Sequence, residues 1–472
     1  NTNNIYIFQK PPSDLKPVAG IMTVSEGNLV SHVQLLARNL GIPNAALSTD
    51  NLKSLQKFSN QNVFYAVSTK GNVILKLEKD MTSEEKKLFS KKERTTNMIT
   101  VPTNQLKLNV SKVINMRDVK AEDSGTLCGP KAANLGELKN LFPEQVVEGL
   151  IIPFGIFKSH MNKKMPNKNK TYWEFLNETF AKADNLKKKN TPKNKIEEFV
   201  LSSLKELHEA ILTIELDKNF VNDLKQNFKK VFGNDIGNVP VFLRSDTNME
   251  DLEEFTGAGL NLTLFNILKE QKIIDGIKSV WASAYTERSF KWRQQYLLNP
   301  ENVYPSILII PSVDVDYSGV MITKGINEGS DEDLTVAFSR GAGGAVDGQS
   351  AETRLITKNN DILLSPARQP DYIRLPSTGS TKRYFTTFNT PILNQKNVND
   401  IRQLASKIRK KIGKNTKSNQ AFDVEFGFKD DKLWLFQIRP FVENKQAKSS
   451  DYLNSIAPKV KISTKINLNE KI

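Results

Sequence analysis

The feature that most constrains the fold is a charged stretch over residues 81–111, which separates two regions with regular apolar patterns. The stretch begins like a helix at Ser83 and then loses its apolar period, as linkers do. At 472 residues the chain is also too long for a single hydrophobic core. We therefore expect a small unit over 1–80, a linker over 81–111, a large unit over 112–442 and a polar C-terminal tail over 443–472.

The composition is that of a soluble globular protein and argues against a membrane or nucleic-acid partner. The chain is 38% hydrophobic and 25% charged, without an apolar run of the roughly 18 residues that a membrane helix needs. The net charge is +15, but the lysines gather in segments 158–170 and 187–195 with little aromatic interleaving. We expect solvated loops there rather than a nucleic-acid surface. One cysteine, Cys128, fits a reducing compartment, and without a signal-like segment we expect a cytoplasmic protein.

The small unit alternates strands and a helix, as small α/β domains do. Strands are predicted over 18–24 and 43–47, with a helix from His32 between them and a hairpin over 63–75. Ser31 is a suitable N-cap for that helix. His32, one of three histidines in the chain, lies in the first helical turn behind a glycine-containing loop, where backbone amides attract phosphate. Taken alone, such a histidine more often packs or caps than reacts.

The large unit alternates helices and strands, including a long helix predicted over 273–297, and contains features of phosphate-binding sites. Lys131 follows a glycine at a predicted helix start, where an ammonium group and the helix N-terminus both attract anions. Arg244 leaves a predicted strand into a loop rich in small polar residues, and arginine can bind phosphate through two hydrogen bonds. A glycine loop over 341–344 follows another strand, although a plain turn explains it equally well.

The last predicted hairpin, around a turn at 429–431, carries two pairs of polar residues. At the two-residue period of a strand, Asp423 and Glu425 share one face of the first arm. Gln437 and Arg439 likewise share a face of the second arm. Paired carboxylates can hold Mg²⁺ through one or two oxygens while phosphates complete its shell. A cross-strand surface salt bridge explains the same residues without a ligand.

Together these segments resemble one protein family. The region 112–442 is similar to the ATP-grasp nucleotide-binding domain of the phosphoenolpyruvate synthase and pyruvate phosphate dikinase group, through residues 129–138, 243–251, 423–425 and 437–440. Residues 16–80 resemble the phosphohistidine domain of that group, with its His-x-x-x-x-Ala-Arg-x-x-Gly-Ile-Pro motif. The resemblance covers most of the chain. It implies an α/β and α+β multidomain protein, with a small swivelling α/β domain followed by a two-lobed ATP-grasp domain.

The resemblance also implies ATP and Mg²⁺ as cofactors. In the family's chemistry a histidine takes the β-phosphate of ATP, AMP leaves, and the histidine domain swings to a second site to deliver the phosphoryl group. By position, the implied residues are His32 as the phosphorylated histidine, Lys131, Arg244, Arg439 and the further candidate Arg288 as ligands of ATP phosphates, Gln437 on the phosphate chain, and Asp423 and Glu425 on Mg²⁺, with His32 and Arg244 as the catalytic pair.

Two departures from the family pattern affect these expectations. The family usually has Gly-Leu-Gly-Glu, whose glutamate holds the adenosine, where this chain has glycine at Gly344; Asp347 and Glu352 are the candidate substitutes. The histidine domain also precedes the nucleotide domain, and no pyruvate-binding barrel is apparent. That order is similar to the order in glucan water dikinases and phosphoglucan water dikinases.

The sequence therefore leaves hypotheses of different classes. We expect a dikinase-like phosphotransferase, which passes the phosphoryl group from His32 to an unidentified acceptor such as a glucan, pyruvate or a small molecule. The alternative is a degenerate ATP-grasp module that binds nucleotide without turnover and regulates or scaffolds a partner. A nucleic-acid-binding protein is supported by charge alone. Because the 472 residues contain no third domain that could bind the acceptor, we expect the acceptor site in a missing region, on a partner or in a homo-oligomer, with no membrane partner.

Overall fold

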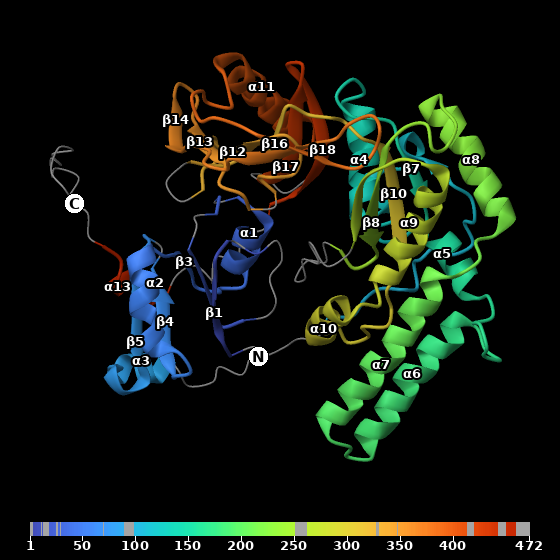
Figure 1. Ribbon diagram of the computed structural model, residues 1–472, viewed down its shortest axis with the longest axis horizontal. Helices are drawn as coiled ribbons and strands as arrows, with labels where there is room; N and C mark the ends of the chain where they lie inside the picture. The colour runs from blue at the N-terminus through green and yellow to red at the C-terminus, as the bar shows by residue number, and fades with distance from the viewer. Residues whose placement is uncertain are drawn as a thin grey trace.

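A computed structural model shows a mixed α/β fold with several sheets (Figure 1). It describes residues 3–10, 12, 18–24, 27–28, 30–68, 70–88, 99–250, 262–326, 330–346, 348–412, 420–441 and 450–458. An N-terminal unit, blue in Figure 1, lies beside two lobes. We call the five-stranded sheet with its helices, teal to yellow, the first lobe, and the six-stranded sheet with its helix, orange to red, the second lobe.

The N-terminal unit is built on a three-stranded parallel sheet. Strands β1 (Ile5–Phe8), β2 (Gly20–Thr23) and β3 (Asn44–Ala46) lie in the order β1-β2-β3. Parallel neighbours need a crossover, and helix α1 (His32–Asn39) supplies it between β2 and β3. Helix α2 (Thr49–Leu55) and the 3-10 turn η1 (Gln56–Phe58) lead to a hairpin of β4 (Val63–Val67) and β5 (Val73–Leu77). These elements confirm the predicted strands, helix and hairpin.

The first lobe is an antiparallel sheet covered by helices. Its strand order is β6 (Ile114–Asn115), β7 (Leu150–Ile152), β10 (Pro305–Pro311), β8 (Val241–Thr247) and β9 (Thr263–Ile267). Its helices are α4 (Pro130–Leu141), α5 (Phe154–Met161), α6 (Tyr172–Lys188), α7 (Lys193–Leu212), α8 (Lys218–Phe232), α9 (Glu270–Ser283) and α10 (Glu287–Tyr296), with short 3-10 turns η3 (Met116–Asp118) and η4 (Ala121–Asp123). The single helix predicted over 273–297 is wrong, because Thr286 starts a new helix by accepting a hydrogen bond from the Ser289 amide at 3.3 Å.

The second lobe is a six-stranded antiparallel sheet with helix α11 (Gln395–Lys411) against it. The strand order is β14 (Asp361–Ser365), β13 (Glu352–Ile356), β12 (Leu334–Arg340), β11 (Tyr317–Ile322), β17 (Phe422–Lys429) and β18 (Lys432–Pro440). A separate hairpin, β15 (Asp371–Arg374) and β16 (Lys382–Phe385), connects β14 to α11. Buried residues of α4 and β10 share one core cluster with the aromatic residues of this sheet, so α4 joins the two lobes.

The expected linker and tail are both wrong in part. Helix α3 (Ser83–Leu88), which follows η2 (Glu78–Asp80), is held to the N-terminal unit by an ion pair of its buried Glu85 with Lys76 of β5 at 2.8 Å, and Val101 packs in the core of the first lobe. The residues between them, 89–98, lie outside the described residues. In the expected tail, helix α13 (Asp451–Ser455) packs against the N-terminal unit through the buried Tyr452. This helix packs rather than remaining in water because the β4–β5 hairpin buries Tyr452 and its apolar neighbours.

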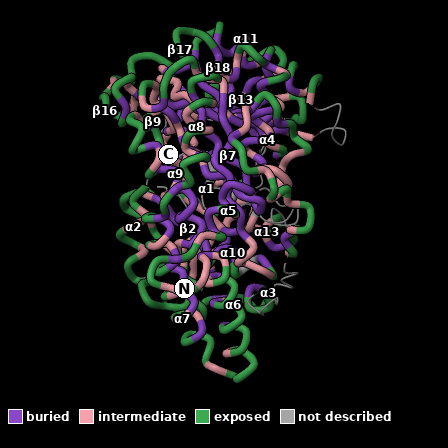
Figure 2. The backbone as a smooth tube through the Cα atoms, turned by 90° about the vertical axis from the view of Figure 1, so that its right-hand side faces the viewer, coloured by how far each residue is buried: buried purple, intermediate pink, exposed green. Residues whose placement is uncertain are grey.

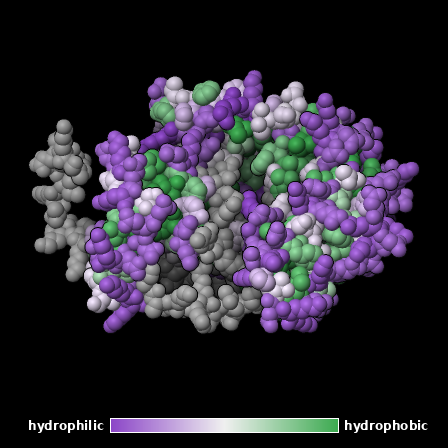
Figure 3. Space-filling view, turned by 60° about the horizontal axis from the view of Figure 1, so that its bottom comes forward, coloured by the Kyte–Doolittle hydropathy of each residue, from purple (hydrophilic) through white to green (hydrophobic). Residues whose placement is uncertain are grey.

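Buried residues lie mainly in the sheets, and hydrophilic residues cover much of the surface. Figure 2 shows buried residues within the sheets, whereas the far ends of α6 and α7 are largely exposed. The lysines of segment 187–195 lie at that exposed turn. Figure 3 shows hydrophilic side chains over most of the face in view, with apolar side chains on both sides of a hollow. Within the described ranges, no helix is both long and apolar enough to cross a membrane.

Candidate active site

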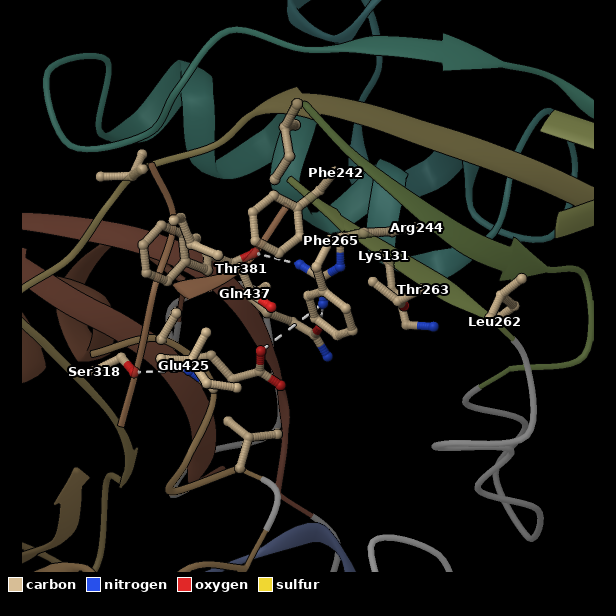
Figure 4. A pocket seen from close by; sticks show the side chains of 18 of the residues that line it. Lys131, Phe242, Arg244, Leu262, Thr263, Phe265, Ser318, Thr381, Glu425 and Gln437 are labelled. Carbon is tan, nitrogen blue, oxygen red and sulfur yellow. Dashed lines mark hydrogen bonds and ion pairs between the residues drawn. The ribbon is translucent and has the colours of Figure 1, made fainter. Parts of the chain in front are cut away.

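The two lobes enclose one pocket of about 1040 Å³, which gathers the site residues predicted in the large unit (Figure 4). All the predicted phosphate and metal ligands except Asp423 line it directly. The lining residues among them are Lys131 from α4, Arg244 from β8, Arg288 from α10, and Glu425, Gln437 and Arg439 from the β17–β18 hairpin. Residues as far apart in the sequence as Lys131 and Arg439 therefore line the same pocket.

The β17–β18 hairpin places its polar residues in the predicted way. Asp423 is the register partner of Arg439, and Glu425 is the partner of Gln437. Arg439 donates from Nε and Nη2 to Asp423 Oδ2 at 2.8 and 2.7 Å, so a cross-strand ion pair is present, but buried rather than on the surface. The other oxygen, Asp423 Oδ1, is buried and has no hydrogen-bond partner among the described residues.

Arg244 connects the first lobe to this hairpin. It lies within β8 opposite Leu308 rather than in a loop, which corrects the prediction that it leaves the strand. Its Nη1 donates to the Phe436 carbonyl at 3.1 Å, and its Nη2 donates to Gln437 Oε1 and lies 3.8 Å from Glu425 Oε2. A cation held between two lobes beside a carboxylate is well placed to contact an anionic ligand.

Lys131 lies at the predicted helix start, but the N-terminus of α4 already has an anionic partner. The Asp246 carboxylate accepts hydrogen bonds from the Lys131 and Ala132 amides at 3.0 and 2.8 Å. Lys131 Nζ donates to the Ser245 carbonyl at 2.9 Å and to Glu250. The expectation that the helix start itself holds phosphate is therefore corrected, because a buried carboxylate occupies it. Burial, and then the nearby charge of Glu250, raise the pKa of Asp246.

Sequence reasoning missed the apolar half of the pocket. Phe242 lies two residues before Arg244 and so shares its face of β8, a signal that strand periodicity could have given. Phe265 from β9 and Leu375, just after β15, complete this side. No local pattern indicated the β15–β16 hairpin as a pocket wall.

The glycine loop 341–344 packs closely against that hairpin. Gly341 has φ of +66°, and a Cβ there would lie 2.1 Å from the Ile373 carbonyl oxygen. The Ala342 amide donates to the same oxygen at 2.9 Å. Ala342 and Gly343 line the pocket. The glycines are therefore required by packing as well as by conformation.

Glu352, one of the two candidate substitutes for the missing family glutamate, is engaged elsewhere in the structure. Its buried carboxylate pairs with Arg354 Nε at 2.7 Å and accepts hydrogen bonds from the Ile392 and Leu393 amides, the second at 3.2 Å. Its oxygens are engaged by these partners and Glu352 is not among the residues that line the pocket, so the structure does not support it as the substitute. The other substitute, Asp347, lies outside the described residues.

Helix α1, which begins at His32, starts beside the residues that directly follow the glycine loop 341–344. The side chain of His32 lies outside the described residues. Asn28, four residues earlier, donates from Nδ2 to the Ala345 and Gln349 carbonyls at 2.7 and 3.0 Å. Val30 and Leu35 pack in one buried cluster with residues of β11, β12 and this loop. One loop thus contacts both the pocket and the segment that leads into α1.

Of the other two histidines, His160 lies in the core and His208 at the pocket. His160 is buried, with Nδ1 2.8 Å from the Ile156 carbonyl and Nε2 accepting from the Asp217 amide at 3.0 Å. Burial lowers the pKa of His160 and keeps its ring neutral. His208 lines the pocket, with Nδ1 2.9 Å from the Ala282 carbonyl.

Comparison with known proteins agrees with a two-lobed nucleotide site. The family model described as pyruvate phosphate dikinase, AMP/ATP-binding domain, matches residues 125–458, and the chain belongs to this family. A probable phosphoenolpyruvate synthase from Pyrococcus horikoshii is 24% identical over 261 residues, covering 52% of this chain and 31% of the relative. The phosphoenolpyruvate synthase of Aeropyrum pernix is 23% identical over 231 residues, covering 42% of this chain and 28% of the relative.

A rifampicin phosphotransferase from Bacillus cereus is 26% identical over 320 residues, covering 66% of this chain and 34% of the relative. The chain thus spans about a third of the length of these curated relatives. The family match begins at residue 125, later than the predicted start of the large unit, and ends at 458, beyond its predicted end. It includes all the pocket residues predicted from the sequence.

Proposed function

We propose that this chain is the phosphohistidine and nucleotide-binding part of an ATP-dependent, dikinase-like phosphotransferase. We assign the N-terminal unit as the phosphohistidine domain and the two lobes as an ATP-grasp domain. One observation carries the proposal: the loop that lines the pocket at Ala342, Gly343 and Val346 also binds Asn28 through its Ala345 carbonyl. A nucleotide in the pocket and the start of α1 are therefore both adjacent to one short loop.

The two halves of the pocket match the two ends of ATP. The cationic half holds Arg244, Arg288 and Lys131, with Arg439 beside them, and these charges suit a triphosphate. Gln437 lies among them. The apolar half, with Phe242 and Phe265, suits an adenine ring, which gains from leaving water and from contact with aromatic side chains.

The carboxylates of β17 fit Mg²⁺. Asp423 Oδ1 is buried without a partner among the described residues, and Glu425 lines the pocket two positions along the strand. No group of three His, Cys, Asp or Glu side chains in the described ranges could hold a metal by itself. Mg²⁺ bound by one or two carboxylates is completed by phosphate oxygens. Asp423 and Glu425 would hold the ion, which would neutralise charge on the phosphates.

The phosphoryl step then follows from ordinary chemistry. A nitrogen of the neutral His32 ring bonds to the β-phosphorus, the bond from that phosphorus to the α,β-bridging oxygen breaks, and AMP leaves with that oxygen and its electron pair. Water takes the γ-phosphoryl group as orthophosphate. An acceptor oxygen next takes the remaining phosphoryl group: a hydroxyl oxygen, which gives up its proton, or in pyruvate the enolate oxygen formed when the methyl group loses a proton. We propose a glucan, pyruvate or a small molecule as acceptor.

The test is incubation with Mg²⁺ and ATP labelled at either the β- or the γ-phosphate. The wild type and Asn44→Ala, whose lost hydrogen bond to Gln34 at 2.8 Å lies within the N-terminal unit, should retain β-label and release an equal amount of AMP. His32→Ala should retain no label. The γ-label should appear as orthophosphate, and the protein-bound β-label should be stable to base and labile to acid.

A different outcome supports the alternative function. If the wild type binds ATP but neither retains label nor releases AMP, the chain acts as a nucleotide-binding module without turnover. Retention of β-label by folded His32→Ala would assign the phosphorylated residue elsewhere and refute the proposed role of His32.

A further inference from the structure

A single asparagine joins the two lobes at the apolar end of the pocket. Asn266 belongs to β9 of the first lobe, and its Nδ2 donates to the Pro376 and Ser380 carbonyls at 2.8 and 2.6 Å. The Ser380 amide returns a hydrogen bond to the Asn266 carbonyl at 2.8 Å. Both partners lie in the turn between β15 and β16, which belongs to the second lobe. This set of three hydrogen bonds crosses from one lobe to the other.

The conformation and burial of Asn266 indicate why this position has an asparagine side chain rather than a glycine. Its φ is +51°, in the left-handed region that asparagine tolerates and glycine adopts freely. The residue is fully buried, and its Oδ1 has no hydrogen-bond partner among the described residues. A glycine would satisfy the backbone without burying an unpartnered oxygen. The asparagine side chain is therefore explained by the two carbonyls that its N–H groups reach.

The hairpin that Asn266 holds is fixed to the second lobe by the last residues of β15, directly before the turn. Arg374 bonds Asp314 through Nε at 2.9 Å and Asp316 through Nη1 at 3.0 Å. The Ile373 carbonyl accepts from the Ala342 amide at 2.9 Å. The hairpin is consequently anchored in the second lobe, and its turn reaches across to β9.

The bridge lies directly beside the pocket. Phe265 precedes Asn266, Thr381 follows Ser380, and both residues line the pocket, as does Leu375 next to Pro376. Figure 4 shows Phe265 and Thr381 around the same space as Arg244 and Gln437. A change in the distance between Asn266 and the turn would therefore widen the apolar half of the pocket.

We propose that Asn266 is an interlobe latch: a positioning residue that fixes the spacing of the lobes around the base of a bound adenine nucleotide and slows its release. The proposal rests on the proposed nucleotide occupancy of the pocket. It assigns Asn266 no contact with the nucleotide. Asn266 acts on the walls of the pocket around the base. Its loss should therefore increase the rate of nucleotide dissociation while leaving the cationic contacts to the phosphates in place.

The experiment measures release of an anthraniloyl-labelled ATP by stopped-flow fluorescence, in the His32→Ala background so that phosphotransfer does not enter. Asn266→Ala should increase the dissociation rate about tenfold or more, with an association rate changed less than about threefold. Asn266→Gly should behave the same, because it relaxes the left-handed backbone but lacks the amide. In both variants, hydrogen exchange of the 376–381 turn should accelerate without nucleotide.

Asn397→Ala is the matched control. Asn397 is also a fully buried asparagine with one side-chain atom lacking a partner among the described residues, but it bonds Tyr317 and Asn394 within the second lobe. It should lower the melting temperature and leave nucleotide release unchanged.

Three results would overturn the latch. The first is a wild-type rate of nucleotide dissociation in both Asn266 variants, even if amide hydrogen exchange of the 376–381 turn is faster, because the hydrogen bonds of Asn266 would then not control release. Equal acceleration by Asn397→Ala would show a general loss of stability. Failure of the His32→Ala protein itself to bind the analogue would refute nucleotide occupancy, and the latch with it, whereas a failed latch leaves the phosphohistidine proposal standing.

Discussion

At the scale of single residues, the pocket depends on side chains that reach from one lobe to the other. Arg244 is the clearest case, because its guanidinium lies between its own strand and the β17–β18 hairpin. Sequence spacing identified it together with Lys131 and Gln437. It did not identify Asp246, since a carboxylate that caps a helix more than a hundred positions away leaves no local pattern.

Arg244→Lys should weaken ATP binding about tenfold or more. Lysine keeps the charge but cannot reach a carbonyl, an amide oxygen and a phosphate at once, and charged hydrogen bonds contribute ~1.5–3 kcal/mol each. Isothermal titration with ATP and Mg²⁺ measures the change. Arg402→Lys is the control, since Arg402 bonds the Thr357 and Asn360 carbonyls outside this pocket. Equal affinities for Arg244→Lys and the wild type would exclude Arg244 from the binding site.

At the scale of secondary-structure elements, regular patterns gave reliable predictions. The hairpin of β17 and β18 and the common face of Asp423 and Glu425 follow from a two-residue period and a polar turn. The β15–β16 hairpin escaped prediction because its role as a wall arises only after the chain folds. The break before α10 escaped it because apolar residues continue through the helix junction, while one threonine cap starts the new helix.

The segment before α1 supplies a second prediction. Asn28→Ala removes the hydrogen bonds to the Ala345 and Gln349 carbonyls and should slow label transfer to His32 several-fold. The ATP dissociation constant should remain unchanged, because Asn28 is not part of the pocket lining. Quenched-flow labelling at saturating ATP measures the rate. Asn44→Ala, an equal truncation within the same unit, should transfer label at the wild-type rate; equal slowing in both variants would contradict a docking role for Asn28.

At the scale of the whole molecule, the structure brings together segments that no sequence pattern relates. Tyr452 donates to Glu85 at 2.6 Å, and Lys76 pairs with the same carboxylate at 2.8 Å. The Tyr452 ring meets Phe64 edge-on with centroids 5.6 Å apart, and Asn72 donates to the Ile456 carbonyl at 2.8 Å. The polar composition of the last segment concealed this contact, because one tyrosine and two aliphatic residues make most of its apolar surface.

This cluster predicts a pH dependence of stability. Hydrogen bonds from Lys76 and Tyr452 lower the pKa of Glu85 from 4.5 to about 2. The unfolded chain therefore binds a proton before the folded chain does, so the stabilisation is complete above about pH 4.5 and is lost as the pH falls toward 2. Chemical unfolding across this range should show a smaller loss for Glu85→Gln than for the wild type.

Glu78→Gln, an exposed neighbour on η2, serves as the control and should follow the wild-type curve. Identical slopes for Glu85→Gln and the wild type would mean that the cluster contributes no pH-dependent stability.

The docking of α13 also determines how the N-terminal unit is connected. With α13 bound, the unit is joined covalently to the lobes at two places, once on each side of the nucleotide region in the sequence. The shorter connection, from Phe441 to Ser450, can span at most roughly 30 Å. In the sequence, the two lobes are thus inserted between the β4–β5 hairpin with α3 and the helix α13 that packs against them. Any movement of the N-terminal unit relative to the lobes is therefore limited by the length of the connection from Phe441 to Ser450 as well as by the surfaces in contact.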